Sequence, residues 1–178
     1  MTAEANIAPH WRFSLAVYGS PGVAPACLLL QDRCGLDVNV LLLALYAVLE
    51  LEQSMDDGAI ADLDAQARSL RESVVVPLRK IRQHMKGRDY GAATEKVRQQ
   101  VKKAELMAEE LEQSLLAEWV AGRPASNSPS DARATAQRVV RHSLQQRGNG
   151  GTLDAEEEAA VALIAAAAGK VAAAQAGE

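Results

Sequence analysis

Ten consecutive apolar residues, from Val40 to Leu49, constrain the fold more than any other stretch of this 178-residue chain. A helix of this composition is apolar on every face, so other elements must surround it. The run is too short to span a membrane, which takes roughly 18 apolar residues or more. Aromatic residues make up only 3% of the chain and alanine is abundant, which favours helices over a sheet. We therefore predict an all-α domain built around this helix.

Residues with capping preferences divide the N-terminal part into three short helices. Pro9 is suited to the first turn of a helix, because its fixed backbone angle is already helical. Gly35 can adopt the left-handed conformation that ends a helix, and Asp37 can cap the next helix with its side chain. We expect helices over residues 8–18, 24–34 and 38–55, with the third helix buried.

A different pattern follows, in which apolar residues recur with the 3–4 spacing of long amphipathic helices. The recurrence runs through Ile60, Leu63, Ala67, Leu70, Val74, Leu78, Ile81 and Met85, and then through Val97, Val101, Ala104, Ala108, Leu111 and Leu115. A break at residues 87–91 predicts a tight turn, so the two helices form a hairpin. Pro77 removes one hydrogen bond from the first helix, which predicts a kink. The same pattern could also join two copies, so self-association stays open.

The composition changes again after residue 121. Residues 122–130 are rich in Pro, Ser and Gly, which is typical of a linker. Asp154 and Glu157 have the spacing of a capping box at the start of a last, alanine-rich helix. Because alanine buries little apolar area, we expect this part to dock weakly or to stay independent. The predicted organisation is an all-helical domain at 8–121, a linker at 122–130 and a flexible, helical or partly disordered extension at 131–178.

The net charge of −4 is distributed unevenly along the chain. Residues 1–58 hold seven acidic and two basic residues, whereas residues 79–103 hold nine basic and two acidic residues. A hairpin would gather these cations around its turn, where they could bind a polyanion by releasing counterions. The candidate anion-binding residues are Arg79, Lys80, Arg82, Lys86, Arg88, Lys96, Arg98, Lys102 and Lys103. The plainer interpretation is a solvated helix pair whose charges keep it soluble.

A second candidate site is the polar corner between the second and third helices. Asn39 stands directly ahead of the apolar run and needs hydrogen-bond partners there. The candidate pocket residues are His10, Trp11, Tyr18, Gln31, Asp32, Arg33, Asp37 and Asn39, with His10 as the candidate base. The alternative is that these side chains only cap helix ends and form exposed pairs.

Catalytic and metal-binding motifs are absent: the chain has no GxxxxGK[ST], GxGxxG, GxSxG or HExxH and no calcium loop. We therefore expect an interaction protein rather than an enzyme, without a metal or a cofactor. Cys27 and Cys34 are too far apart in one helix for a disulfide and lack zinc-site spacing, so we expect two buried, reduced thiols. The N-terminal residues have no signal-peptide pattern, which makes the cytoplasm the expected location.

Several short motifs in the first two thirds of the chain carry a family resemblance. They are Trp11, Tyr18, Pro21-Gly22-Val23, Ala26-Cys27-Leu28, Gln31-Asp32, Gly35, Asp37-Val38-Asn39 and Pro77-Leu78-Arg79. Through these motifs, roughly residues 8–120 resemble a proteobacterial family of uncharacterised proteins known only as a domain of unknown function. The resemblance implies an all-helical cytoplasmic protein, and it brings no activity, substrate or cofactor.

Two functional hypotheses from different classes follow. The favoured one is a non-enzymatic interaction protein whose basic hairpin tip binds an acidic partner: nucleic acid, the ribosome or an acidic protein surface. The other is a small-molecule or cofactor pocket, with catalysis as an option, at the corner between Gln31 and Asn39. An exposed field of hairpin cations would support the first hypothesis. A concavity lined by Trp11, Asp32 and Asp37 would support the second.

Overall fold

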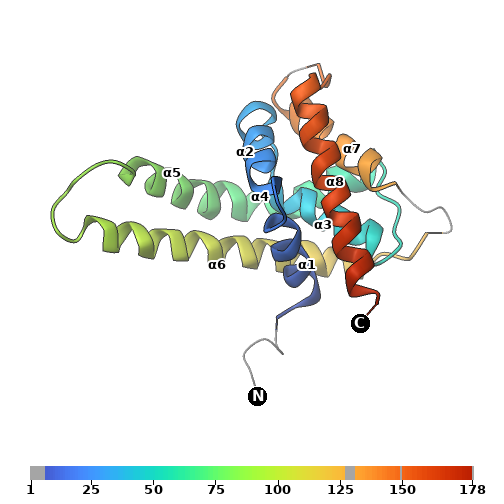
Figure 1. Ribbon diagram of the computed structural model, residues 1–178, viewed down its shortest axis with the longest axis horizontal. Coiled ribbons are helices and arrows are strands. Elements are labelled where there is room, and N and C mark those ends of the chain that lie inside the picture. Colours follow the sequence, from blue (N-terminus) through green and yellow to red (C-terminus); the bar gives the residue numbers. More distant parts are fainter. Residues whose placement is uncertain (1–6, 127–130, 149, 178) are drawn as a thin grey trace.

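The computed structural model describes residues 7–126, 131–148 and 150–177, which form helices and connecting turns without a strand. The N-terminal part contains α1 (Pro9–Tyr18), α2 (Val23–Cys34) and α3 (Val38–Leu49). A hairpin follows, made of α4 (Asp57–Leu70), a π-helical segment η2 (Arg71–Val75), α5 (Val76–Met85) and α6 (Thr94–Ala121). The last two helices are α7 (Ala132–Gln146) and α8 (Ala155–Gln175). The predicted all-α fold is confirmed (Figure 1). No single helix of the described residues is long and apolar enough to cross a membrane, although α1 and α2 together, bent by 93°, meet the same criterion of length and composition.

The helix α3 lies at the centre of the core, as its composition predicts. Within the apolar run, only Tyr46 and Leu49 keep partial exposure, and the other residues are buried. Helices α1, α4, α6, α7 and α8 all pack against α3. Fully burying one leucine side chain stabilises the folded state by about 1.5–3 kcal/mol, so this helix contributes a large part of the apolar burial.

The corner between α2 and α3 is fixed by two capping residues. Gly35 has a φ of 73°, in the left-handed region where a side chain would strain the backbone. Asp37 Oδ1 accepts hydrogen bonds from the backbone N–H groups of Asn39 (2.8 Å) and Val40 (3.3 Å). Asp37 is therefore the N-cap of α3, as predicted.

The C-terminal end of α3 lies at Leu49, not near residue 55 as the sequence pattern predicts. Glu52 has a positive φ of 52°, which is incompatible with a continuing helix. The side chain of Gln53 is buried, and its Nε2 donates to the carbonyl oxygens of Val120 (2.9 Å) and Arg123 (3.0 Å). Tertiary hydrogen bonds to the end of α6 thus hold this segment, and a local pattern cannot reveal them.

The predicted hairpin is confirmed, because α4, η2 and α5 pack in turn along α6. Figure 1 shows α5 and the first part of α6 side by side, projecting away from the other helices. No residue of α5 is buried. The hairpin therefore has an inner part that belongs to the core and an outer part that contributes no buried side chain to it.

The expected kink at Pro77 takes the form of the π-helical segment Arg71–Val75. In a regular helix the Pro77 ring would collide with the carbonyl group of Ser73, four residues earlier. A π-helical turn is wider than an α-helical turn and is a common way to accommodate such an interruption. Ser73 lies within this segment, and its hydroxyl donates a hydrogen bond to the carbonyl oxygen of Ser69.

The flexible C-terminal extension is not confirmed. Ala136, Val139 and Val140 of α7 are buried in the same core cluster as α3, and so are Val161 and Ile164 of α8. The predicted capping box is present, since the Asp154 side chain and the Glu157 side chain each accept from the other's backbone N–H. Small alanine side chains let α8 approach its neighbours closely, and its few larger residues supply the buried area. Of the predicted linker, residues 127–130 lie outside the described residues.

Cys27 and Cys34 are both free and buried, as the sequence analysis predicts. Burial in the apolar core raises the pKa of each thiol to about 12. Both side chains are therefore protonated at neutral pH and act as small apolar core residues.

Candidate functional site

A cavity of 390 Å³ opens where the base of the hairpin meets the N-terminal helices, with walls from α1, α2, α3, α5 and α6. Its apolar lining consists of Trp11, Leu15, Tyr18, Leu28, Val38, Leu42 and Leu106. Arg79, Arg82 and Lys102 of the hairpin contribute to the polar lining. Members of both candidate sites from the sequence analysis therefore meet in one concavity.

Five of the eight candidate pocket residues line this cavity, namely Trp11, Tyr18, Gln31, Asp37 and Asn39. His10 instead borders a second cavity of 620 Å³, and burial lowers the pKa of its imidazole. Arg33 pairs with Asp154 (3.3 Å) and Glu156 (2.6 Å) at the start of α8. Asp32 is exposed and lies outside the cavity. The structure therefore separates His10, Asp32 and Arg33 from the other five residues.

Asn39 and Gln113 connect the cavity to a buried hydrogen-bond network. Asn39 Nδ2 donates to Glu112 Oε2 at 2.8 Å, and Gln113 Nε2 donates to Asn39 Oδ1 at 3.0 Å. All three side chains are buried. The partners that Asn39 needs thus come from α6, and the network fastens the start of α3 to the hairpin.

Glu112 is a carboxyl group inside the core. Burial raises the pKa of Glu112 far above its ordinary value, and the neighbouring Asp37 carboxylate raises it further. Arg71 Nη1 lies 2.7 Å from Asp37 Oδ2, so the Asp37 carboxylate already has a cation as its partner. A protonated Glu112 therefore avoids a second negative charge beside Asp37.

Replacing Glu112 with glutamine is expected to flatten the pH dependence of stability above about pH 4.3, the ordinary carboxyl pKa. Between that pH and the raised pKa of Glu112, the folded state holds a proton that the unfolded state has lost, so wild-type stability falls as pH rises. This loss amounts to at most about 1.4 kcal/mol per pH unit. Glutamine stays neutral and keeps an acceptor for Asn39. Urea unfolding at a series of pH values measures the difference, and parallel curves for the two proteins would contradict a protonated Glu112.

Two arginines of α5 are held by carboxylates of α6 beside the cavity. Arg79 pairs with Glu109 (2.7 Å) and Glu105 (3.2 Å), and it also donates to Gln31 Oε1 at 3.1 Å. Arg82 pairs with Glu105 as well. Burial alone would raise the pKa of Glu105, but the hydrogen bonds from Arg82 and Arg79 hold it below its usual value. These arginines are engaged within the hairpin and are not part of an open basic field.

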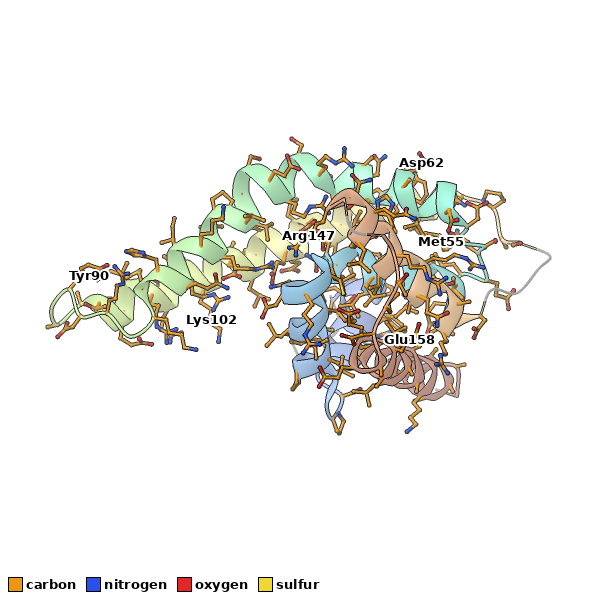
Figure 2. All side chains as sticks on the ribbon, turned by 90° about the horizontal axis from the view of Figure 1, so that it is seen from above. Met55, Asp62, Tyr90, Lys102, Arg147 and Glu158 are labelled. Atoms are coloured by element: carbon orange, nitrogen blue, oxygen red, sulfur yellow. The ribbon has the colours of Figure 1, made fainter. Side chains whose placement is uncertain are left out.

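The remaining candidate cations are mostly free. Arg98 pairs with Glu95 at 2.8 Å on the same helix. Six others are exposed and have no ion pair within the described residues: Lys80, Lys86, Arg88, Lys96, Lys102 and Lys103. Figure 2 shows Tyr90 at the far end of the hairpin and Lys102 between that end and the body. The nine predicted cations thus divide into three arginines paired with carboxylates and six side chains without an ion pair among the described residues, of which Arg88 is hydrogen-bonded to His84 at 3.2 Å.

The helix α6 buries polar side chains and leaves much of its predicted apolar seam exposed, although Ala108 of that seam is buried. Leu111 is 52% exposed and Leu115 is 39% exposed, whereas Glu105, Glu112 and Gln113 are buried. These polar side chains can be buried because α3 and α5 supply hydrogen-bond partners for them. None of these three residues is a predicted site residue. Glu105 and Gln113 line the cavity, and Glu112 accepts a hydrogen bond from Asn39.

The carboxylates of the cavity all have polar partners. They are engaged by arginines, by backbone N–H groups or by Asn39, so none of them is a free base beside the apolar lining. Within the described part of the chain, no group of three or more His, Cys, Asp or Glu side chains is placed to hold a metal ion. The fold and site thus define an all-helical protein with a projecting hairpin and a cavity at its base.

Comparison with known families assigns the chain more specifically. Residues 9–116 match the model of a family described as a protein of unknown function, DUF2390. This protein therefore belongs to that family, which confirms the resemblance to a domain of unknown function. The match begins with α1, extends far into α6 and includes every residue that lines the 390 Å³ cavity. No curated protein and no solved structure matches the chain.

Proposed function

We propose that this chain is an interaction protein whose helical hairpin binds an acidic protein surface. The observation that carries the proposal is the outer hairpin, in which neither α5 nor residues 94–103 of α6 contain a buried residue (Figure 1). An element without buried side chains adds little to folding stability. A role in binding accounts for its length.

The surface of the outer hairpin combines positive charge with exposed apolar side chains. Ile81, Tyr90 and Val97 are all exposed. The unpaired cations of the hairpin lie on the same two helices and the turn between them. Protein interfaces use such combinations, because apolar residues contribute affinity and complementary charge accelerates association and selects the partner.

Three arginines of the hairpin are already paired with carboxylates, which favours a protein partner over a nucleic acid. Arginine matches the geometry of a phosphate group better than lysine does. Arg79, Arg82 and Arg98 are already bound to carboxylates. Tyr90 is the one Phe, Tyr or Trp residue between positions 57 and 118, so the hairpin offers no row of rings on which bases could stack.

Reversing three hairpin charges is expected to reduce capture of the acidic partner at least tenfold without unfolding the protein. The variant carries Lys86→Glu, Lys96→Glu and Lys103→Glu, which are exposed and unpaired positions within the described residues. Wild type and variant are used as bait in a nuclease-treated lysate, and the captured proteins are quantified by mass spectrometry. Capture by the wild type is expected to weaken as salt rises, because salt screens exposed charges.

A matched control carries Arg12→Glu, Arg141→Glu and Lys170→Glu, which make the same change of charge at exposed positions away from the hairpin. This control is expected to capture the partner as the wild type does. Equal capture by all three proteins would overturn the proposal. Capture that disappears after nuclease treatment would also overturn it, in favour of a nucleic acid.

A further inference from the structure

We propose that the 390 Å³ cavity at the base of the hairpin binds a small organic anion with an apolar body. This inference goes beyond the interaction function, because it concerns a small ligand inside the cavity and not a protein surface along the outer hairpin. The volume lies within the range of about 300–1,000 Å³ that is usual for small-molecule sites. Such sites combine an apolar lining with a few polar groups that orient the ligand, and both are present here.

Several large apolar side chains around the cavity are left without full cover. The exposed side chains come from three different helices: Leu15 and Tyr18 from α1, Leu28 from α2 and Leu106 from α6. The three helices do not bury these side chains against one another. Trp11 adds an indole ring to the same lining. Exposed apolar groups gathered around a concavity mark a binding surface more often than single exposed residues do. An apolar ligand body would remove this surface from water.

Three accessible hydrogen-bond donors of the lining lack a partner within the described residues. Lys102 has no ion pair within the described residues. The indole N–H of Trp11 and the hydroxyl of Tyr18 make no hydrogen bond to another described residue. Donors beside an apolar surface select a ligand that carries acceptors, and hydrogen bonds to an ionised acceptor are the strongest of this kind. A carboxylate, sulfonate or phosphate group meets that requirement.

The carboxylates of the cavity repel a bound anion only weakly, because each of them is buried or paired with an arginine. The side chains of Glu105 and Asp37 are only 6% and 12% exposed. Arg79 and Arg82, which pair with Glu105, are more accessible at 23% and 28%. Glu109 is tied to Arg79 at 2.7 Å, and burial raises its pKa. Glu109, at 24%, is as accessible as Arg79, so Lys102 supplies the one charge of the lining that no ion pair with a described residue compensates.

Two fluorescent probes with the same ring system test the two halves of the site. The first is 8-anilinonaphthalene-1-sulfonate, which has an apolar body and an anionic group, and the second is N-phenyl-1-naphthylamine, which lacks the sulfonate. The full chain is expected to bind the sulfonate probe saturably at one site and at least tenfold more tightly than the neutral probe. Lys102→Glu is expected to weaken the sulfonate probe at least tenfold and the neutral probe less than twofold.

A second variant and a control locate the binding. Leu106→Glu, at an exposed position of the lining, is expected to weaken both probes, whereas Lys170→Glu on α8 is expected to change neither. Circular dichroism checks that every variant keeps its helix content. Equal affinity for the two probes, or binding that is indifferent to Lys102→Glu and Leu106→Glu, would overturn the proposal. Lys102 is not among the lysines reversed to test the hairpin, so the two proposals can fail separately.

Discussion

Replacing Arg71 with methionine is expected to lower the free energy of unfolding by about 3 kcal/mol, near the lower limit for breaking a buried ion pair. Arg71 Nη1 lies 2.7 Å from both Asp37 Oδ2 and Asp64 Oδ1. All three side chains are largely buried. The loss is large because methionine fills a similar volume but removes the buried cation that the two carboxylates share.

This arginine connects the N-cap of α3 to the hairpin. Asp37 caps α3, whereas Asp64 belongs to α4 and Arg71 begins the π-helical segment. Burial alone would raise the pKa of Asp64, but hydrogen bonds from Arg71, His142 and Arg68 hold it below its ordinary value. Asp64 is therefore ionised at neutral pH and depends on its cations.

Chemical unfolding at neutral pH measures the effect, and Arg68→Met is the matched control. Arg68 also pairs with Asp64, at 3.3 Å, but its side chain is 49% exposed. Pairs of this kind contribute less than about 1 kcal/mol, so the control is expected to unfold nearly as the wild type does. Similar losses in the two variants would contradict a central role for Arg71.

Replacing Ile164 with alanine is expected to lower the free energy of unfolding of the whole protein by about 3 kcal/mol, within the usual range for removing a buried aliphatic side chain. Ile164 lies on α8 and is completely buried in the core cluster that contains α3. If the last helix is part of one cooperative core, the cavity left by the substitution shifts a single unfolding transition.

Its neighbour supplies the control, because Leu163 is 42% exposed on the same turn of α8. Leu163→Ala is expected to cost less than about 1 kcal/mol, as surface substitutions usually do. Thermal unfolding followed by circular dichroism compares the two variants. A separate transition for the last helix, with the main transition unchanged by Ile164→Ala, would contradict a common core.

The parts of the fold that the sequence predicts correctly are those that depend on local rules. Gly35 and Asp37 define a corner through backbone conformation and capping, which involve only neighbouring residues. The central position of α3 follows from a composition that no surface helix could have. Pro77 predicts an interruption of its helix, because the clash that it causes is also local.

The candidate site could be predicted only in part, because its polar groups depend on pairs distant in sequence. Asn39 indicates that partners are needed, but nothing nearby in the sequence identifies Glu112 and Gln113. A signal was nevertheless present on α6. Glu105 and Glu112 are seven residues apart and share the helical face of Leu116, which is buried. Counting them as core residues would have identified the buried face.

The C-terminal helices illustrate a second limit of sequence analysis. Alanine buries little area by itself, so an alanine-rich helix predicts weak docking. The burial of α8 in the core comes instead from Val161 and Ile164, together with the buried Ala160, Ala165 and Ala168. The contribution of small residues to packing depends on the shape of the facing helices, and the sequence of α8 alone does not predict that shape.

The central claim is that the outer hairpin is a binding arm that the core does not require. The most direct test is the dissociation constant of the captured acidic partner, measured against salt concentration for the wild type and for the variant with Lys86→Glu, Lys96→Glu and Lys103→Glu. The wild-type affinity is expected to fall steeply with salt, while the variant binds weakly throughout, keeps its melting temperature and shows little salt dependence. Equal affinities with the same salt dependence would contradict the claim.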